Sequence, residues 1–267
     1  MKLRILAVTA SLLICLGLVW HREAAGEPGP ANQALDPRAL VDRLYTVAGQ
    51  MPIRDMIAEM ECSDASPDTG NMVSTGKDKT YYKFPNKLRI DSVIRDPGGP
   101  MDGRQVITIR DGTNAWHFVS TGQYPVKKAP DPPSPTLNLP YNLQRYPQDN
   151  ARNYELGGSQ TIDGVATRAV KITNPHDPQD IRIVYIDVQR NVPLRLEIQI
   201  PGNKGGGPTK KRVDYKDIRR LDDGRYMPFM LEIYENDRLQ KVRVYSGVKV
   251  NVGLQDSLFQ PMSGLMR

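Results

Sequence analysis

The chain has 267 residues and a formal net charge of +6, with 36 Lys and Arg residues against 30 Asp and Glu residues. This length suits one large all-β domain or two small ones, and we expect one. Because the basic residues are spread along the chain, the charge is more typical of a solvated surface than of a nucleic-acid-binding face.

Residues 1–26 have the three parts of an export signal: a basic start, an apolar run from Ile5 to Trp20 and small residues at Ala24–Gly26. We predict cleavage near Gly26 and an exported mature protein, with an uncleaved membrane anchor as the alternative. The mature chain would have a net charge of about +4 and begin with a flexible lead at 27–35. Only Cys62 would then remain of the two cysteines, so core packing must stabilise the fold without a disulfide.

A short amphipathic helix is expected after this lead. Asp36 is a natural N-cap, and Pro37 suits the first helical position. Apolar residues between Leu40 and Ala48 then share one side, before Gly49 ends the helix. Such a helix lies on a sheet or covers one end of it.

From residue 56 onward the hydrophobic period is two, which is typical of half-buried strands. In Val192–Ile200, for example, four apolar residues fall on one face and three polar residues on the other. Asp111-Gly112 predicts a hairpin, and 238–245 and 248–252 read as two strands of a closing antiparallel meander. We predict about ten or eleven strands in all.

The stretch 121–152 interrupts this pattern with seven prolines, which cannot serve as central-strand residues. A connection this long inside a compact domain is usually functional or disordered. It still contains large apolar residues, among them Leu139, Tyr141 and Leu143. We therefore predict a partly helical lid that rests on an apolar surface.

The sequence contains no recognisable catalytic constellation. His117 and His176 each stand alone, without a second imidazole at metal-ligand spacing. Asp222 and Asp223 read as turn formers, and neither a GxSxG motif nor a phosphate loop is present. We expect a protein without enzymatic activity, metal or cofactor.

A large curled sheet under a lid encloses an apolar hollow that suits acyl chains. For each lining residue, ordinary core packing is the alternative. The residues expected to line the hollow are Leu88, Ile90, Trp116, Phe118, Leu194, Leu196, Ile198, Phe229, Leu231 and Ile233, with Leu139, Tyr141 and Leu143 on the lid.

Four stretches carry a family resemblance through their order and spacing: YYKFPNKLRID (81–91), DGTNAW (111–116), VYIDVQRNVPLRLEIQ (184–199) and NVGLQDSLFQP (251–261). Together they resemble the LolA/LolB-like superfamily of outer-membrane lipoprotein-sorting proteins. The resemblance implies a mainly β fold over 36–267, an unclosed curled antiparallel barrel with helices over its concave face. It also implies a periplasmic carrier for the acyl chains of lipoproteins or lipids.

In the soluble carrier of that family, an Arg directly before the Pro-Asn of the first motif ties the lid to the barrel. Phe84 stands at this lid-coupling position here, which favours a paralogue with different cargo or a sensor. The resemblance implies an inner-membrane donor and an outer-membrane acceptor protein. We also expect a monomer, and the spread of the charge argues against a nucleic-acid partner. The alternative is an envelope-stress or assembly factor that binds a protein partner on the same sheet, as RseB-like regulators of sigma-factor signalling do.

Overall fold

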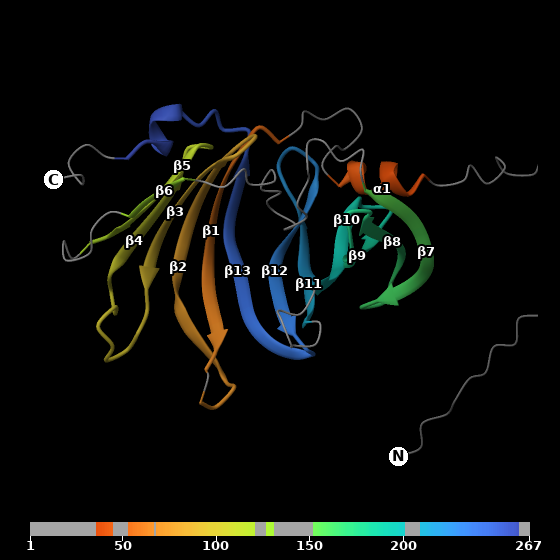
Figure 1. Cartoon of the computed structure of the whole chain (residues 1–267), viewed down its shortest axis with the longest axis horizontal. Coiled ribbons are helices and arrows are strands. Elements are labelled where there is room, and N and C mark those ends of the chain that lie inside the picture. The colour runs from red at the N-terminus through yellow and green to blue at the C-terminus, as the bar shows by residue number, and fades with distance from the viewer. Residues whose placement is uncertain are drawn as a thin grey trace, which may run out of the picture. The chain divides into compact units, whose positions relative to one another are not determined.

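Thirteen strands in the described parts of the chain form one antiparallel sheet, shown in Figure 1. The sheet order is β6-β5-β4-β3-β2-β1-β13-β12-β11-β10-β9-β8-β7, so every neighbour in the sheet is a neighbour in sequence except the pair β1 and β13. The sheet thus consists of two meanders joined at one seam, and it is not closed into a barrel. The predicted fold class is confirmed, with more strands than the ten or eleven expected.

The computed structural model describes residues 36–44, 53–66, 68–120, 127–130, 152–200 and 209–261. The predicted signal, the lead and most of the predicted lid lie outside these residues, so those predictions stay predictions. In chain order the elements are α1 (Pro37–Arg43), β1 (Asp55–Ala65), β2 (Met72–Lys83), β3 (Lys87–Ile94), β4 (Gln105–Arg110), β5 (Asn114–Val119), β6 (Lys127–Pro130), β7 (Asn153–Ile162), β8 (Val165–Asn174), β9 (Asp177–Asp187), β10 (Val192–Ile200), β11 (Thr209–Arg220), β12 (Tyr226–Glu235), β13 (Arg238–Val250) and the 3-10 helix η2 (Asp256–Phe259).

The helix α1 begins as the sequence predicts. The Asp36 side chain accepts a hydrogen bond from the backbone N–H of Arg38 at 3.0 Å, and Pro37 occupies the first turn. Leu40, Val41 and Leu44 are buried, and the helix lies against β7 and β8. The continuation predicted to Ala48 lies outside the described residues.

The sequence reading of 238–252 as two strands is wrong, because β13 runs unbroken to Val250. Opposite it, Glu59 pairs with Gly247 but Met60 pairs with Tyr245, so β13 carries one extra residue there. Such a bulge shifts the alternation by one residue. The apolar pattern before and after it is therefore out of phase, which imitates a break between two strands.

The hairpin predicted at Asp111-Gly112 is confirmed between β4 and β5. Asp111 accepts hydrogen bonds from the backbone N–H groups of Thr113 and Asn114, both at 2.8 Å. Gly112 has a φ of +96°, and a Cβ there would lie 2.5 Å from the Asn86 side chain. Only glycine therefore fits this turn without strain.

The strand β6 falls within the stretch predicted as a lid. It pairs with β5 alone and forms one edge of the sheet, with Pro130 at its end. A proline is tolerated there because an edge strand needs hydrogen-bond donors on one side only. At the C-terminal end, η2 lies against β3, and Phe259 is fully buried.

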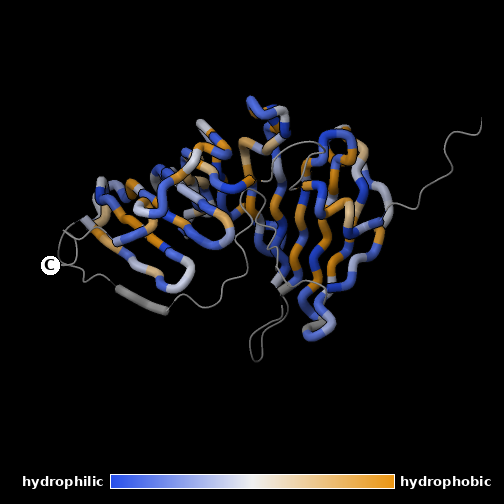
Figure 2. The backbone as a smooth tube through the Cα atoms, turned by 90° about the horizontal axis from the view of Figure 1, so that it is seen from above, coloured by the Kyte–Doolittle hydropathy of each residue, from blue (hydrophilic) through white to orange (hydrophobic). Residues whose placement is uncertain are grey.

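Hydrophobic and hydrophilic residues alternate along most strands, as Figure 2 shows. We call the face that carries Met56, Ala58, Tyr82 and Leu231, and that packs against α1, the inner face; the opposite face is the outer face. Residues paired directly across antiparallel strands share a face. The register therefore assigns a face to every paired residue in the sheet.

Candidate functional site

The inner face has two ends that differ in how completely their side chains are buried. At the helix end, formed by β8–β12 and α1, the core residues are closely packed, and Val170, Val184 and Leu196 are 0% exposed. Six predicted hollow residues lie here. Leu194, Leu196, Phe229 and Leu231 belong to the core cluster, and Ile198 and Ile233 pack against it partly buried.

The partly exposed end of the inner face is formed by β2–β4. Tyr82 pairs with Leu88 and Thr80 pairs with Ile90, so both predicted residues of β3 lie on the inner face. Leu88 is buried, whereas Ile90 keeps part of its surface exposed, as does Val106 further along the same face. The sequence assignment of Leu88 and Ile90 to the same surface as Leu196 agrees with this register.

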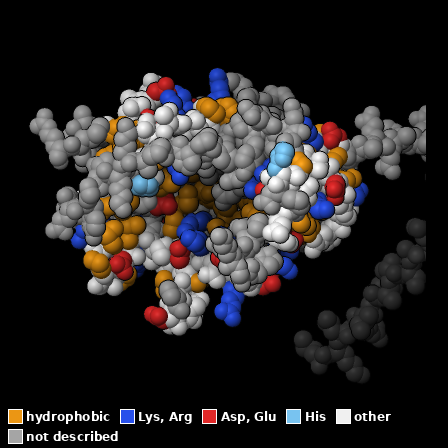
Figure 3. All heavy atoms as spheres, in the orientation of Figure 1, with side chains coloured by type: hydrophobic (Ala, Val, Ile, Leu, Met, Phe, Trp, Pro, Cys, Tyr) orange, Lys and Arg blue, Asp and Glu red, His pale blue; other side chains and the backbone are white. Residues whose placement is uncertain are grey.

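Figure 3 shows a hollow in the middle of the side that faces the viewer in Figure 1, over the central strands of the sheet. Hydrophobic side chains form much of its floor, and basic and acidic side chains interrupt them. A floor of this kind can hold a hydrocarbon chain, and the charged groups can fix a polar end.

The register does not bring Trp116 and Phe118 onto the inner face. They pair with Ile109 and Ile107 of β4, which in turn pair with outer-face residues of β3. Ile109, Trp116 and Phe118 form a small buried cluster of their own. The alternation in β5 correctly predicts that the two rings share a face, but it does not say which face.

The side chain of Phe84, at the predicted lid-coupling position, is 52% exposed in the turn between β2 and β3, where the Phe84–Pro85 peptide bond is cis. It lines a cavity of about 580 Å³ together with Arg54, Lys83 and the segment 251–255. The predicted lid residues Leu139, Tyr141 and Leu143 lie outside the described residues. A role for Phe84 in coupling a lid therefore stays a prediction.

Beside this cavity, the buried carboxylate of Asp55 accepts hydrogen bonds from the backbone N–H groups of Val252, Gly253 and Leu254, at 2.6 to 3.3 Å. The sequence analysis did not identify this residue. The one sequence feature that could have pointed to Asp55 is its position directly before a strand with apolar alternation. The contact holds the segment after β13 against the start of β1.

The sequence analysis also missed a polar cluster in the middle of the inner face, formed by Cys62, Asp64, Asp78, Lys241 and Arg243. The Arg243 guanidinium donates to Asp64 at 2.7 Å, and Lys241 lies 3.6 Å from the same carboxylate. The Cys62 thiol donates to Asp78 at 3.4 Å. Burial, reinforced by the nearby Asp78 carboxylate, raises the pKa of Cys62 to about 12, so the thiol stays neutral at physiological pH.

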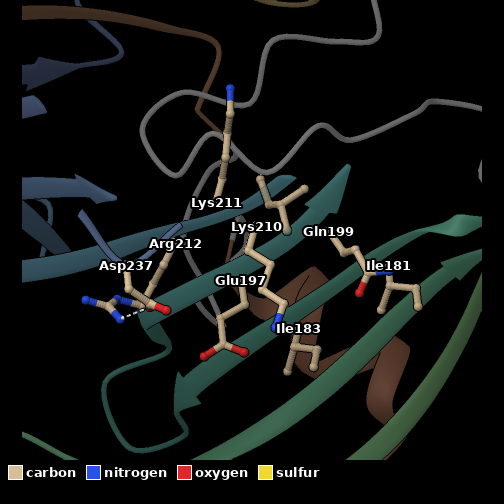
Figure 4. Close-up of a pocket in the computed structure, with 9 residues that line it drawn as sticks. Ile181, Ile183, Glu197, Gln199, Lys210, Lys211, Arg212 and Asp237 are labelled. Atoms are coloured by element: carbon tan, nitrogen blue, oxygen red, sulfur yellow. Dashed lines mark hydrogen bonds and ion pairs between the residues drawn. The ribbon is translucent and has the colours of Figure 1, made fainter. Parts of the chain in front are cut away.

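A second described cavity, of about 370 Å³, lies on the outer face near the ends of β9–β11 (Figure 4). Its walls combine isoleucine side chains with polar and charged ones, and the side chain of Lys211 points away from the others. Arg212 pairs with Asp237 at 3.3 Å across it. Because Arg212 is also 3.3 Å from Asp214, its charge is balanced by acids, as in an ordinary charged surface.

The described residues contain no group of three or more His, Cys, Asp or Glu side chains placed to hold a metal ion. His117 Nδ1 lies 3.0 Å from Thr108 Oγ1, and Asp223 accepts a hydrogen bond from the backbone of Arg225 within its turn.

Among the helices that the structure describes, none has the length and apolar character needed to cross a bilayer.

No protein-family model and no curated protein matches the sequence. Solved structures do match it over most of its length. A DUF1329 family protein from Desulfovibrio piger has a TM-score of 0.59 at 17% identity, covering 86% of this chain and 99% of its own. A LolA superfamily protein from Nitrosomonas europaea has a TM-score of 0.57 at 13% identity, with 85% and 99% covered.

A domain described as an outer membrane lipoprotein-sorting protein, from Vibrio parahaemolyticus, has a TM-score of 0.56 at 11% identity, covering 83% of this chain and 95% of its own. These likenesses agree with the predicted resemblance in overall fold. At such low identity they establish the fold. The chain therefore has the LolA-like fold.

Proposed function

We propose that this protein is a non-enzymatic carrier that binds the acyl chains of a lipid or lipoprotein on the inner face of its sheet. The observation that carries the proposal is the hollow over the central strands, whose floor is largely hydrophobic (Figure 3). The LolA-like fold supports it, because a sheet that stays open keeps one face available for a guest.

The energetics of apolar burial are sufficient for such binding. Each methylene group that leaves water contributes about 0.8 kcal/mol, so a long acyl chain needs few polar contacts. Ile90 and Val106 supply partly exposed apolar surface for it at one end, and Ile198 and Ile233 supply it at the other. Leu88, Leu194, Leu196, Phe229 and Leu231 would support this surface from below.

The predicted export signal at 1–26 supports a periplasmic location for the carrier, where hydrophobic cargo would cross an aqueous space. Transfer towards the outer membrane would then need a donor at the inner membrane and an acceptor at the outer membrane. The stretch 121–152, with Leu139, Tyr141 and Leu143, would close over the bound chains as a lid.

The test is to purify the full chain from the periplasm without detergent, extract it with organic solvent and identify lipids by mass spectrometry. We expect acyl lipids in stoichiometric amounts. The variant Ile90→Glu places a charge on the inner face and should lose them, because a carboxylate beside an acyl chain is strongly disfavoured.

Val93→Glu is the matched control. Val93 lies on the same strand but on the outer face, and it is 46% exposed. This variant should keep the wild-type lipid content. An extract without lipid, together with a co-purified protein partner, would contradict the carrier proposal and favour the alternative of a partner-binding factor.

A further inference from the structure

An arginine in the middle of the inner face is the starting point. Arg243 of β13 pairs directly with Cys62 of β1 and with Leu231 of β12, so it lies on the face that would hold acyl chains. Its side chain is only 19% exposed. A charge this far removed from water is costly unless it is paired.

Among the residues that the structure describes, the contacts of Arg243 use one of its three nitrogens. Nη1 donates to Asp64 at 2.7 Å and to the backbone carbonyls of Ser63 and Val242, both at 2.9 Å. Within the described residues, no contact of Nε or Nη2 accompanies these bonds. Two N–H-bearing nitrogens of a planar guanidinium therefore remain for another acceptor, and their fork geometry matches a carboxylate or a phosphate.

The charges around Arg243 permit an anion there. Lys241 shares the Asp64 carboxylate with Arg243, so two cations face one anion at this point. The other nearby acid, Asp78, is engaged with the Cys62 thiol, which contributes no charge of its own because its pKa is raised by burial. Asp78 therefore balances the second cation, and the charges of the cluster sum to zero. The unused nitrogens of Arg243, and not a net positive charge, favour an anion here, and Asp78 opposes it.

We infer that Arg243 binds the oxyanion of an amphiphilic ligand, a carboxylate or phosphate head group, whose acyl chain lies on the neighbouring apolar surface. This inference rests on the proposed function and adds the head-group chemistry to it. The apolar floor supplies most of the affinity. Arg243 supplies the choice of an anionic head group over a neutral one and fixes the position of the chain.

The experiment compares the fluorescent polyene fatty acid cis-parinaric acid with its methyl ester, at a pH where the free acid is ionised. The wild-type protein should bind the acid at least about tenfold more tightly than the ester, because a hydrogen bond to a charged group has this magnitude. Arg243→Gln should bring the two affinities together and leave ester binding unchanged.

Three further variants make the test independent of a fold defect in Arg243→Gln. Arg243→Lys keeps the charge without the fork and should keep part of the preference. Asp78→Asn removes a repulsive charge and should raise the preference above the wild-type value. Arg238→Gln, at an exposed position on the same strand, removes the same charge elsewhere and should change nothing.

Equal affinities of wild-type protein for acid and ester would overturn the inference while leaving the proposed carrier function intact. The inference also fails if Arg243→Gln and Arg238→Gln reduce the preference equally, since that result reports net charge alone. If inorganic phosphate alone binds the wild-type protein as tightly as cis-parinaric acid does, and Arg243→Gln abolishes this binding, the site takes a free oxyanion, and the assignment to a head group is wrong. Absence of binding to either probe would overturn the inference together with the proposed function.

Discussion

At the helix end of the inner face, most apolar side chains of β8–β12 and α1 are buried against one another, and Ile198 and Ile233 are partly exposed beside them. At the partly exposed end, Ile90 and Val106 keep part of their surface exposed. Both ends are built from the same alternating strands. The difference is that α1 lies against β7 and β8, at the helix end. The helix end therefore contributes most of the stability of the fold, and the partly exposed end contributes mainly apolar surface that a ligand can cover.

The largest effect on stability is expected from Leu196→Ala at the helix end. Leu196 is 0% exposed, so its truncation leaves a cavity and should lower the free energy of unfolding by about 3 kcal/mol. Chemical denaturation monitored by circular dichroism measures this change. The affinity for cis-parinaric methyl ester of the folded variant should stay near that of wild type. A large loss of affinity at unchanged stability would reverse the roles of the two ends.

The alternation of Val192–Ile200 predicts β10 with the bounds that the structure shows, because the hydrophobic period of a half-buried strand is visible in the sequence of that strand alone. The side of the sheet is not a local property. Trp116 and Phe118 reach the outer face through the register of β3 with β4, which the sequence of β5 does not contain. To predict which face a residue occupies, or where a bulge lies as in β13, the register with the partner strand must be known.

The polar cluster could not be identified from local pattern for a related reason. In 55–65, Cys62 and Asp64 occupy inner-face positions, but in the sequence they look like the point where the apolar alternation of the strand ends. Arg243 looks like any exposed strand arginine until β1 and β12 flank it. The two strands that create its environment lie in different parts of the sequence, so only the seam between the two meanders brings the cluster together.

A smaller, pH-dependent effect is expected at the border between the two ends, where Tyr245 lies. Burial raises the pKa of Tyr245 to about 12, above its ordinary value of 10.0. The unfolded chain therefore loses this proton first, so the stabilisation is complete below about pH 10 and is lost as the pH rises towards 12. The loss attributable to this residue should be about 2 to 3 kcal/mol.

The measurement is the free energy of unfolding across that pH window for wild type and for Tyr245→Phe. The variant should show a shallower decline, because it lacks the group that titrates. Tyr82, Tyr185 and Tyr234 also have raised pKa values and remain in both proteins, so the difference between the two curves isolates Tyr245. Parallel curves would show that its hydroxyl is accessible to water in the native state.

The smallest change in stability is expected from Ile90→Ala at the partly exposed end. Because Ile90 is incompletely buried, its truncation should cost about 1 kcal/mol or less. The affinity for cis-parinaric methyl ester should nevertheless fall roughly threefold to tenfold, since the lost methyl groups would contact the acyl chain. Val93→Ala, on the outer face of the same strand, should change neither quantity. If Ile90→Ala lowers stability as much as Leu196→Ala and leaves the affinity unchanged, both ends are solid core, and no surface remains at this end for an acyl chain.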